Sequence, residues 1–297
     1  MPCFSPIQAW VSGKTATGKR AITFQKQAAA TPETLNLPCG RCVGCRLERS
    51  RQWAVRCVHE ASLNELNCFI TLTYEKLPED GSLDKTEFQR FMKRLRKRVG
   101  PVRFYHCGEY GEKNGRPHYH ALLFGYDFPD RVFLSEKNGI KSYTSEILSQ
   151  LWPLGFSAVG DVTFESAAYV ARYILKKING ELSDEHYSNK DTGVIKQSEY
   201  TTMSRRPGIG KLWFDKFKTD VFPSDEVIVR GKQCSPPRYY GDLLDKLDPM
   251  MYEMVKSIRK ENGKRLSSDN DSFRLKVKEE CVESKIKQLV RPLEVMI

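Results

Sequence analysis

The chain has 297 residues and carries 48 Lys and Arg against 37 Asp and Glu, a formal net charge of +11. A positive field of this size favours a polyanionic partner such as nucleic acid. No apolar run reaches the ~18–20 residues of a membrane span, and the N-terminus lacks a signal-peptide pattern. We therefore expect a soluble intracellular protein that does not enter a membrane. Its nine cysteines are then expected as thiols or metal ligands rather than disulfides.

The first hundred residues predict two helices and a strand between them. The apolar spacing of residues 46–66 predicts the first helix. CFITLTY, residues 68–74, alternates and is rich in β-branched side chains, as a strand is. Asp84 and Glu87 have capping-box spacing and predict the start of the second helix. Its apolar side chains fall on one helical face: Phe88, Phe91, Met92, Leu95 and Val99.

A hairpin is predicted next, from VRFYHCGEYG (102–111) and RPHYHALLFGY (116–126), because Asn114-Gly115 suits a type I′ turn. Residues 126–160 are predicted to be a long connection with a helix at 144–152.

Beyond this connection, residues 160–166 predict a strand, residues 167–178 a helix, and the tail from Gly241 short amphipathic helices. The order of elements predicts an α+β fold with an antiparallel sheet and a helical C-terminal region.

Two of the five histidines, His118 and His120, stand one residue apart in the second hairpin strand. They point to one face, roughly 6.5–7 Å apart, and can converge on one metal ion. A two-residue turn pairs Glu109 with His120, and a four-residue loop pairs it with His118, so both registers place Glu109 on this face. An odd loop would bring His106 or Glu112 there instead. His, His and Glu with open positions favour Mg²⁺ or Mn²⁺ acting on phosphates, although imidazoles also accept Zn²⁺.

YVARYILKK, residues 169–177, predicts a stripe of Tyr169, Tyr173 and Lys176 on one helical face, followed by Lys177. The alternative is that both rings pack in the core. Tyrosine has a pKa of ~10 and needs a metal-polarised electrophile and nearby positive charge to act as a nucleophile. Beside a metal site, the stripe favours DNA nicking, in which a tyrosine oxygen attacks phosphorus, the 3′-hydroxyl leaves and the 5′-phosphate stays on the enzyme.

The N-terminal segment contains C-x-x-C-x-x-C, a spacing typical of metal ligands, formed by Cys39, Cys42 and Cys45. A structural Zn²⁺ needs four ligands, and we expect Cys3 as the fourth, with Cys57 or His59 as alternatives. The other interpretation is three reduced thiols in a loop. A separate basic segment, SRRPGIGK at residues 204–211, is expected to contact DNA through three cations, Arg205, Arg206 and Lys211.

In this order, FITLTY, the H-hydrophobic-H pair and Y-x-x-x-Y with its lysines resemble the HUH rolling-circle replication initiators. With PCGRCVGCR, GEYGEKNGRPHYHALLFG and SRRPGIG, the chain looks most like the initiators of gokushovirus-type microviruses, which are single-stranded DNA phages. The resemblance implies a ferredoxin- or RRM-like HUH domain whose helices flank a central five-stranded antiparallel sheet, with His118 and His120 on a central strand. It also implies Tyr169 and Tyr173 as alternating nucleophiles.

The expected function is a site-specific, metal-dependent single-strand DNA endonuclease and strand transferase that starts rolling-circle replication. Its partners would be single-stranded or supercoiled DNA at an origin and a host helicase in the bacterial cytoplasm. The predicted domains are the cysteine-containing segment 1–66, the endonuclease 67–215 and the helical region 216–297. Two alternatives remain: a non-catalytic zinc-containing DNA-binding protein, and a related HUH relaxase or transposase.

Overall fold

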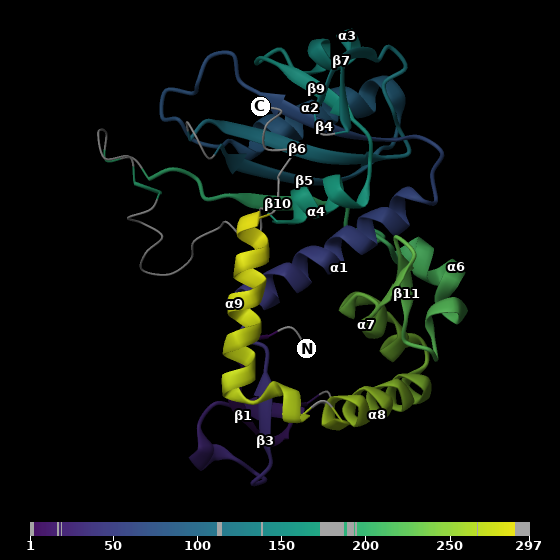
Figure 1. Cartoon of the computed structure of the whole chain (residues 1–297). Coiled ribbons are helices and arrows are strands. Elements are labelled where there is room, and N and C mark those ends of the chain that lie inside the picture. The colour runs from purple at the N-terminus through teal and green to yellow at the C-terminus, as the bar shows by residue number, and fades with distance from the viewer. Residues whose placement is uncertain are drawn as a thin grey trace. The chain divides into compact units, whose positions relative to one another are not determined.

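The structure is a computed structural model of the whole chain (Figure 1), and it describes residues 3–16, 18, 20–111, 115–137, 139–172, 187–188, 193, 195–265 and 267–288. The chain divides into two compact units, one formed by Met1–Arg49 with Lys256–Val290 and the other built around Ser50–Val255. The predicted division of the chain into functional regions at residues 66 and 215 stays a prediction. No helix in the described ranges is long and apolar enough to cross a membrane.

A seven-stranded antiparallel sheet forms the centre of the larger unit, in the order β10-β5-β6-β4-β9-β8-β7. Its strands are β4 (Asn67–Thr73), β5 (Arg103–Tyr110), β6 (Pro117–Phe124), β7 (Val132–Lys137), β8 (Ile140–Thr144), β9 (Ser157–Gly160) and β10 (Tyr200–Met203). The α+β class is confirmed, and β6, which carries both histidines, lies inside the sheet as expected.

The predicted count of five strands is wrong because the β7–β8 hairpin lies where we expected a connection. A turn signal was present in Asn138-Gly139, and Gly139 has a φ of 77°, which favours glycine. The strand predicted at 160–166 is also displaced: β9 ends at Gly160, and a helix begins at Phe164.

Within the described residues, the helices are α1 (Val43–Ala61), α2 (Lys85–Val99), α3 (Glu146–Leu151), α4 (Phe164–Arg172), α6 (Lys211–Val221), α7 (Arg238–Leu247), α8 (Pro249–Arg265) and α9 (Ser272–Gln288). The start of α2 is as predicted, since the Asp84 side chain accepts a hydrogen bond from Thr86 N–H at 2.7 Å. The helical character of the C-terminal region is confirmed by α7, α8 and α9.

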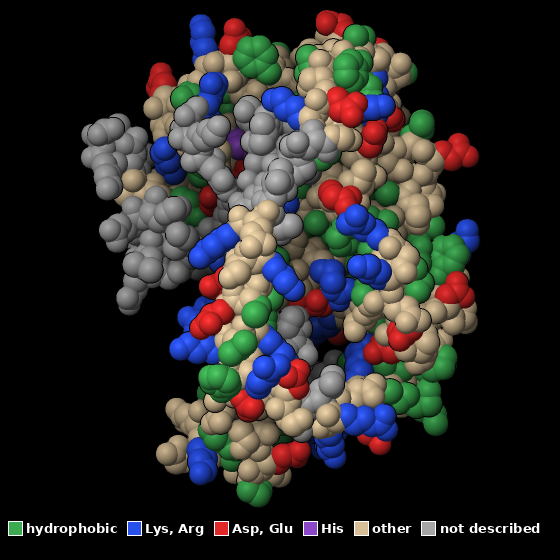
Figure 2. Space-filling view, in the orientation of Figure 1, with side chains coloured by type: hydrophobic (Ala, Val, Ile, Leu, Met, Phe, Trp, Pro, Cys, Tyr) green, Lys and Arg blue, Asp and Glu red, His purple; other side chains and the backbone are tan. Residues whose placement is uncertain are grey.

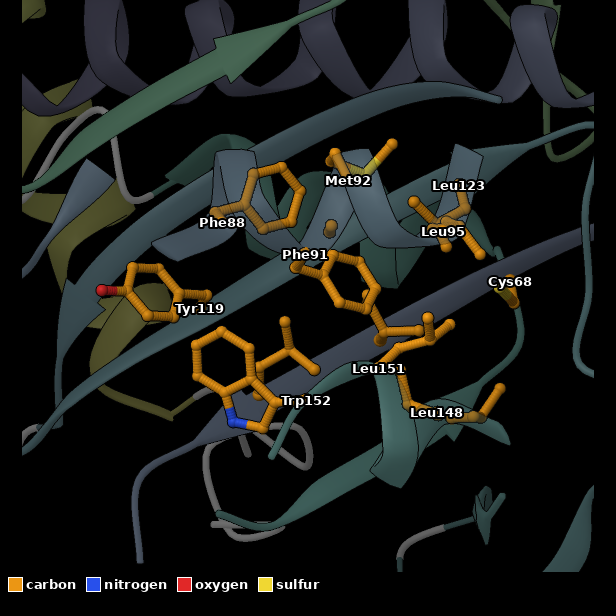
Figure 3. Close-up of a cluster of buried hydrophobic side chains, with 14 of the residues drawn as sticks. Cys68, Phe88, Phe91, Met92, Leu95, Tyr119, Leu123, Leu148, Leu151 and Trp152 are labelled. Carbon is orange, nitrogen blue, oxygen red and sulfur yellow. The ribbon is translucent and has the colours of Figure 1, made fainter. Parts of the chain in front are cut away.

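One face of the large sheet packs against α2 and α3 (Figure 1). The predicted apolar face of α2 is buried there, and Figure 3 shows Phe88, Phe91 and Met92 clustered with Tyr119 and Trp152. Side chains alternate along a strand, so Tyr119 on this face leaves its neighbours on β6, both histidines, on the opposite face.

The opposite face packs against α1 and α4 through Ala54 and Cys57 of α1 and Ala167, Val170 and Ala171 of α4. Ser50 ties the two helices together by donating a hydrogen bond to the Ala168 carbonyl at 3.1 Å. This anchoring fixes α4 over the strands that carry Glu109 and the histidines.

A third buried cluster in this unit joins α6, α7, Val255 at the middle of α8, and the β11 (Val227–Val229)–β12 (Lys232–Cys234) hairpin. His59 of α1 packs against this cluster: its ring stacks on Trp213 with centroids 3.5 Å apart, and its Nδ1 lies 2.9 Å from the Tyr240 hydroxyl.

The smaller unit contains a three-stranded antiparallel sheet, in the order β2-β1-β3, together with α9. Its strands are β1 (Ile7–Lys14), β2 (Arg20–Thr23) and β3 (Thr34–Leu37), and two 3₁₀ turns span Lys26–Ala28 and Ser267–Asn270. Among its described residues, the buried apolar side chains are those of Cys3, Ala9 and Leu275. So small an apolar core needs another source of stability.

Candidate active site

Strand pairing between β5 and β6 brings Glu109 and the two histidines together. Glu109 pairs directly with His118, and Gly111 N–H donates to the Arg116 carbonyl at 2.9 Å. Four residues therefore lie between Gly111 and Arg116, which selects the four-residue register and excludes a two-residue turn. His120 follows His118 on the same face, as the parity argument predicts.

The three side chains converge on one carboxylate oxygen. Glu109 Oε1 lies 2.7 Å from His118 Nε2 and 2.9 Å from His120 Nε2. All three residues are at most 2% exposed. These distances are close to the ~3.0 Å edge of an octahedron whose ligands lie ~2.1 Å from the ion, the distance Mg²⁺ requires. A divalent cation therefore fits this donor set with little movement.

Hydrogen bonds at Nδ1 orient both rings. His118 Nδ1 lies 3.0 Å from the Arg116 carbonyl, which only accepts, so this nitrogen carries a proton. His120 Nδ1 lies 3.0 Å from the Thr71 hydroxyl. An imidazole protonated at Nδ1 offers the lone pair of Nε2, the form that binds metals. The Arg116 carbonyl fixes this form for His118, and His120 takes the same form when its Nδ1–H donates to the Thr71 hydroxyl, so that both Nε2 lone pairs can then bind one metal ion.

Glu109 carries the negative charge that a metal ligand needs. Burial alone would raise the pKa of Glu109, but its interactions with His118 and His120 outweigh burial and lower the pKa below the usual value. The carboxylate is therefore ionised at neutral pH, as a metal ligand must be.

Tyr169 of α4 reaches the same place from the covering helix. Its hydroxyl lies 3.4 Å from Glu109 Oε1 and 3.5 Å from His120 Nε2, and the residue is 2% exposed. The start of α4 is fixed by reciprocal bonds, since Thr163 N–H donates to Ser166 Oγ at 2.8 Å and Ser166 N–H donates to Thr163 Oγ1 at 3.1 Å. The structure thus brings one predicted tyrosine to the triad.

The other members of the predicted tyrosine stripe, Tyr173, Lys176 and Lys177, lie outside the described residues. Their roles stay a prediction. Of the predicted stripe, the structure describes Tyr169 and the part of α4 that carries it.

The four predicted cysteines, Cys3, Cys39, Cys42 and Cys45, form one cluster whose sulfurs all lie within 4.8 Å of one another. The alternatives for the fourth ligand lie elsewhere: Cys57 is buried in the core under α4, and His59 is bonded to Tyr240. Pairing of Ile7 with Leu37 across β1 and β3 explains how Cys3 reaches a motif 36 residues away.

Backbone amides surround these sulfurs in the manner of thiolate ligands. Cys42 Sγ accepts hydrogen bonds from Phe4 N–H at 3.3 Å and Cys45 N–H at 3.5 Å, and Cys39 Sγ accepts one from Cys42 N–H at 3.2 Å. Burial works against ionisation, but these amide bonds outweigh it and lower the pKa of Cys42 to about 6. Burial raises the pKa of Cys45 to about 12, so a cation is needed to ionise the whole cluster.

Comparison with known proteins decides the family. The family model described as "Replication-associated protein ORF2/G2P" matches residues 67–178. The chain is 31% identical to replication-associated protein VP4 of Bdellovibrio phage phiMH2K, over 99% of this chain and 100% of that protein. The chain belongs to the replication-associated proteins of the microviruses.

Two further relatives agree with this assignment. Replication-associated protein ORF2 of Spiroplasma virus 4 is 30% identical over 87% of this chain and 86% of its own length. ORF4 of Chlamydia phage 1, also named a replication-associated protein, is 32% identical over 71% of this chain and 54% of its own length. No solved structure matches the chain. The protein is therefore a phage replication initiator.

The basic segment predicted to hold DNA packs closely against α7 in this initiator. A Cβ on Gly208 would lie 2.5 Å from the Tyr239 hydroxyl, and one on Gly210 would lie 2.8 Å from the Tyr240 hydroxyl. Both glycines therefore permit close packing against α7. Lys211 forms an ion pair with Asp215 at 2.6 Å, which neutralises it, whereas Arg205 and Arg206 are exposed.

Residues that orient the triad were missed in the sequence. Thr71 of β4 bonds to His120, and the Phe69 ring stacks on the His120 ring with centroids 5.5 Å apart. Both stand in FITLTY on the face that the histidines share, and Thr71 is paired with His120 in the register of β4 and β6. The available signal was the hydroxyl of Thr71, which stands between Ile70 and Leu72 in this strand.

Replacing Thr71 with valine is expected to weaken Mn²⁺ binding by roughly 10–100-fold, the usual cost of losing an outer partner of a metal-binding histidine. Valine keeps the shape of threonine but leaves His120 free to turn or change tautomer. Titration calorimetry with Mn²⁺ measures the affinity without requiring cleavage.

A matched control is Thr202→Val. Thr202 Oγ1 makes a similar bond to His106 Nδ1 at 2.9 Å, but His106 stacks on Phe88 on the opposite face of the sheet. If the two variants bind Mn²⁺ equally well, Thr71 does not orient a ligand.

Proposed function

We propose that this initiator is a metal-dependent DNA endonuclease and strand transferase that starts rolling-circle replication by nicking one strand. The observation that carries the proposal is the convergence of Tyr169 OH with Glu109 Oε1 and the two imidazoles in one buried site. A regulator that only bound DNA would have no use for a tyrosine hydroxyl beside three potential metal ligands.

Glu109, His118 and His120 would hold one Mg²⁺ or Mn²⁺ ion. When bound, this ion supplies charge that polarises the scissile phosphate and stabilises its transition state. Three protein ligands leave coordination positions for phosphate oxygens and water. The four groups are at most 2% exposed, so DNA must open this face of the sheet to reach them.

Tyr169 would act as a nucleophile. Its oxygen forms a bond to the scissile phosphorus as its proton leaves, while the bond from phosphorus to the 3′ oxygen breaks. The 3′ oxygen takes up a proton and departs as a hydroxyl, and the 5′ phosphate remains on the tyrosine. Attack by a 3′-hydroxyl on this phosphotyrosine reverses the process and rejoins the DNA, so no energy source is consumed.

The test is incubation of the full chain with supercoiled phage-form DNA and Mn²⁺. Nicked circles carrying covalently attached protein at a 5′ end support the proposal. Binding without nicked circles across Mg²⁺ and Mn²⁺ concentrations would indicate the non-catalytic alternative.

The cysteine cluster would hold a structural Zn²⁺. Four thiolates provide the tetrahedral set that this ion prefers, and the smaller unit buries little apolar surface of its own. The ion would join the N-terminal strand to the start of α1.

Protein purified without added metal is expected to contain about one zinc per chain, and the double variant Cys39→Ser, Cys42→Ser is expected to lose it. Elemental analysis measures both. The control is Cys281→Ser, which changes an exposed cysteine of α9 that is not in the cluster. Absence of zinc from the wild-type protein would instead support the alternative interpretation, in which these cysteines are reduced thiols.

A further inference from the structure

A pocket of about 630 Å³ lies at the end of the large sheet, between the C-terminus of α2 and the segment after β10. Its lining residues come from two stretches of chain: Arg96, Gly100, Pro101, Val102, Arg103 and Phe104 from one, and Ser204, Arg205 and Arg206 from the other. Four of these nine residues are arginines, and none is acidic. One lining arginine, Arg103, forms an ion pair with Glu60, which lies outside the lining.

The pocket keeps a net positive charge after that pairing. Within the described residues, Arg96, Arg205 and Arg206 make no ion pair with a carboxylate. Such charges gathered in a concave site attract anions more strongly than the same charges spread over a flat surface. The surface of α9 is a contrast, because Figure 2 shows basic and acidic side chains mixed along it.

The two lining arginines from the first stretch are held in place. Arg96 donates to the Val102 carbonyl from Nε at 3.2 Å and Nη2 at 2.8 Å, and its guanidinium lies 5.5 Å from the centre of the Phe104 ring. Arg103 donates to the Pro207 carbonyl at 2.9 Å as well as to Glu60. Fixed guanidinium groups lose less conformational entropy when they bind an oxyanion.

The backbone that carries Arg205 and Arg206 is anchored on both sides. Ser204 N–H donates to the Phe104 carbonyl at 3.0 Å, and Ser204 Oγ accepts from Phe104 N–H at 3.1 Å. Beyond them, Gly210 N–H donates to Glu60 at 2.7 Å. Two exposed arginines on an anchored loop therefore face two oriented ones across the pocket.

We propose that this pocket binds a backbone phosphate of the DNA strand at a distance from the cleaved bond. The inference rests on the proposed function for its ligand, a DNA strand. Arg103 and Glu109 belong to the same strand, β5, and a spacing of six positions places them about 20 Å apart. A phosphate in the pocket would thus lie several nucleotides from the metal site and would fix the register of the strand before cleavage.

The experiment measures binding of fluorescein-labelled oligo-dT of about 25 nucleotides, longer than a typical single-strand site, in EDTA, so that no cleavage occurs. Arg205→Gln with Arg206→Gln is expected to weaken binding about tenfold at 0.1 M salt and to reduce the slope of log K against log salt by about 0.7, for the one phosphate contact that is lost. Arg205→Lys with Arg206→Lys keeps the charge and is expected to restore most of the slope.

The matched control is Lys232→Gln with Arg238→Gln, which removes two exposed charges outside the pocket. An unchanged slope in the Arg205/Arg206 glutamine variant, or an equal loss in the control, would overturn the proposal. Nicking of supercoiled DNA by the wild type is scored separately. Absence of nicking would refute the proposed endonuclease activity. The salt dependence of binding in EDTA tests only the proposal that the pocket binds a phosphate.

Discussion

Replacing both His118 and His120 with alanine is expected to abolish nicking of supercoiled DNA, a loss of at least roughly a thousandfold if the metal supplies several kcal/mol to the transition state. Glu109 alone offers one protein ligand, so the double variant removes two of the three side chains that would hold the ion against the scissile phosphate. Nicked circles resolved on an agarose gel give the measurement.

DNA binding by this double variant should persist and keep its salt dependence, because phosphate contacts elsewhere supply most of the affinity. That result separates loss of chemistry from loss of fold. EDTA gives an independent arm that changes no residue: wild-type protein is expected to lose nicking in excess EDTA and to regain it with Mn²⁺. Cleavage that persists in EDTA would contradict the metal site.

The sequence predicted that Glu109, His118 and His120 lie on one face of the sheet, because strand parity constrains their placement strongly. A histidine pair with one residue between them shares a face in any strand, and every even hairpin register places Glu109 on that face. The exact partner of Glu109 depended on loop length, which local sequence did not decide: an Asn-Gly pair suggested a two-residue turn, but pairing of Glu109 with His118 requires four residues. The pairing of β5 with β6 therefore outweighed the preference of Asn-Gly for a two-residue turn.

Long-range partners were harder to predict. Cys3 could be chosen as the fourth thiol only from its residue type, since its approach to Cys39 depends on pairing of β1 with β3. The bond between Thr71 and His120 likewise depends on β4 lying beside β6, which are 49 residues apart at this contact. No periodicity within either segment specifies such a neighbour.

Capping explains why the predicted strand at 160–166 is displaced. Asp161, Val162 and Thr163 have the alternation of a strand, but Thr163 and Ser166 satisfy each other's backbone amides and start α4 instead. This early start has a consequence for the site, because it sets the rotation of α4 that directs Tyr169 to Glu109 rather than away from the sheet.

Single replacements of Tyr169 or Tyr173 by phenylalanine are each expected to keep some nicking of an origin oligonucleotide, and the double replacement is expected to lose it. Rolling-circle replication needs one cleavage to start and a second, with rejoining, to release each unit-length circle. An enzyme with one tyrosine would still be occupied by its own DNA adduct when the second cut is needed.

The chemistry allows an exchange between two tyrosines. The predicted helix over residues 167–178 would place them about one turn, ~5.4 Å, apart, so each could take its turn at one metal-bound phosphate. The position of Tyr169 OH beside Glu109 and His120 supports its share of this role. Lys176 would stabilise developing charge, with Lys177 as its substitute.

Mass spectrometry of trapped adducts is expected to find DNA on either tyrosine in the wild type and only on the remaining one in each single variant. The control is Tyr105→Phe, which removes the hydroxyl of another buried tyrosine on the same face of the sheet and should leave nicking intact. Full activity in the double variant, or an adduct on neither tyrosine, would mean that these rings only pack in the core. An adduct confined to Tyr169 would instead mean a single nucleophile, so that release of each circle would need a second protein molecule to make the other cut.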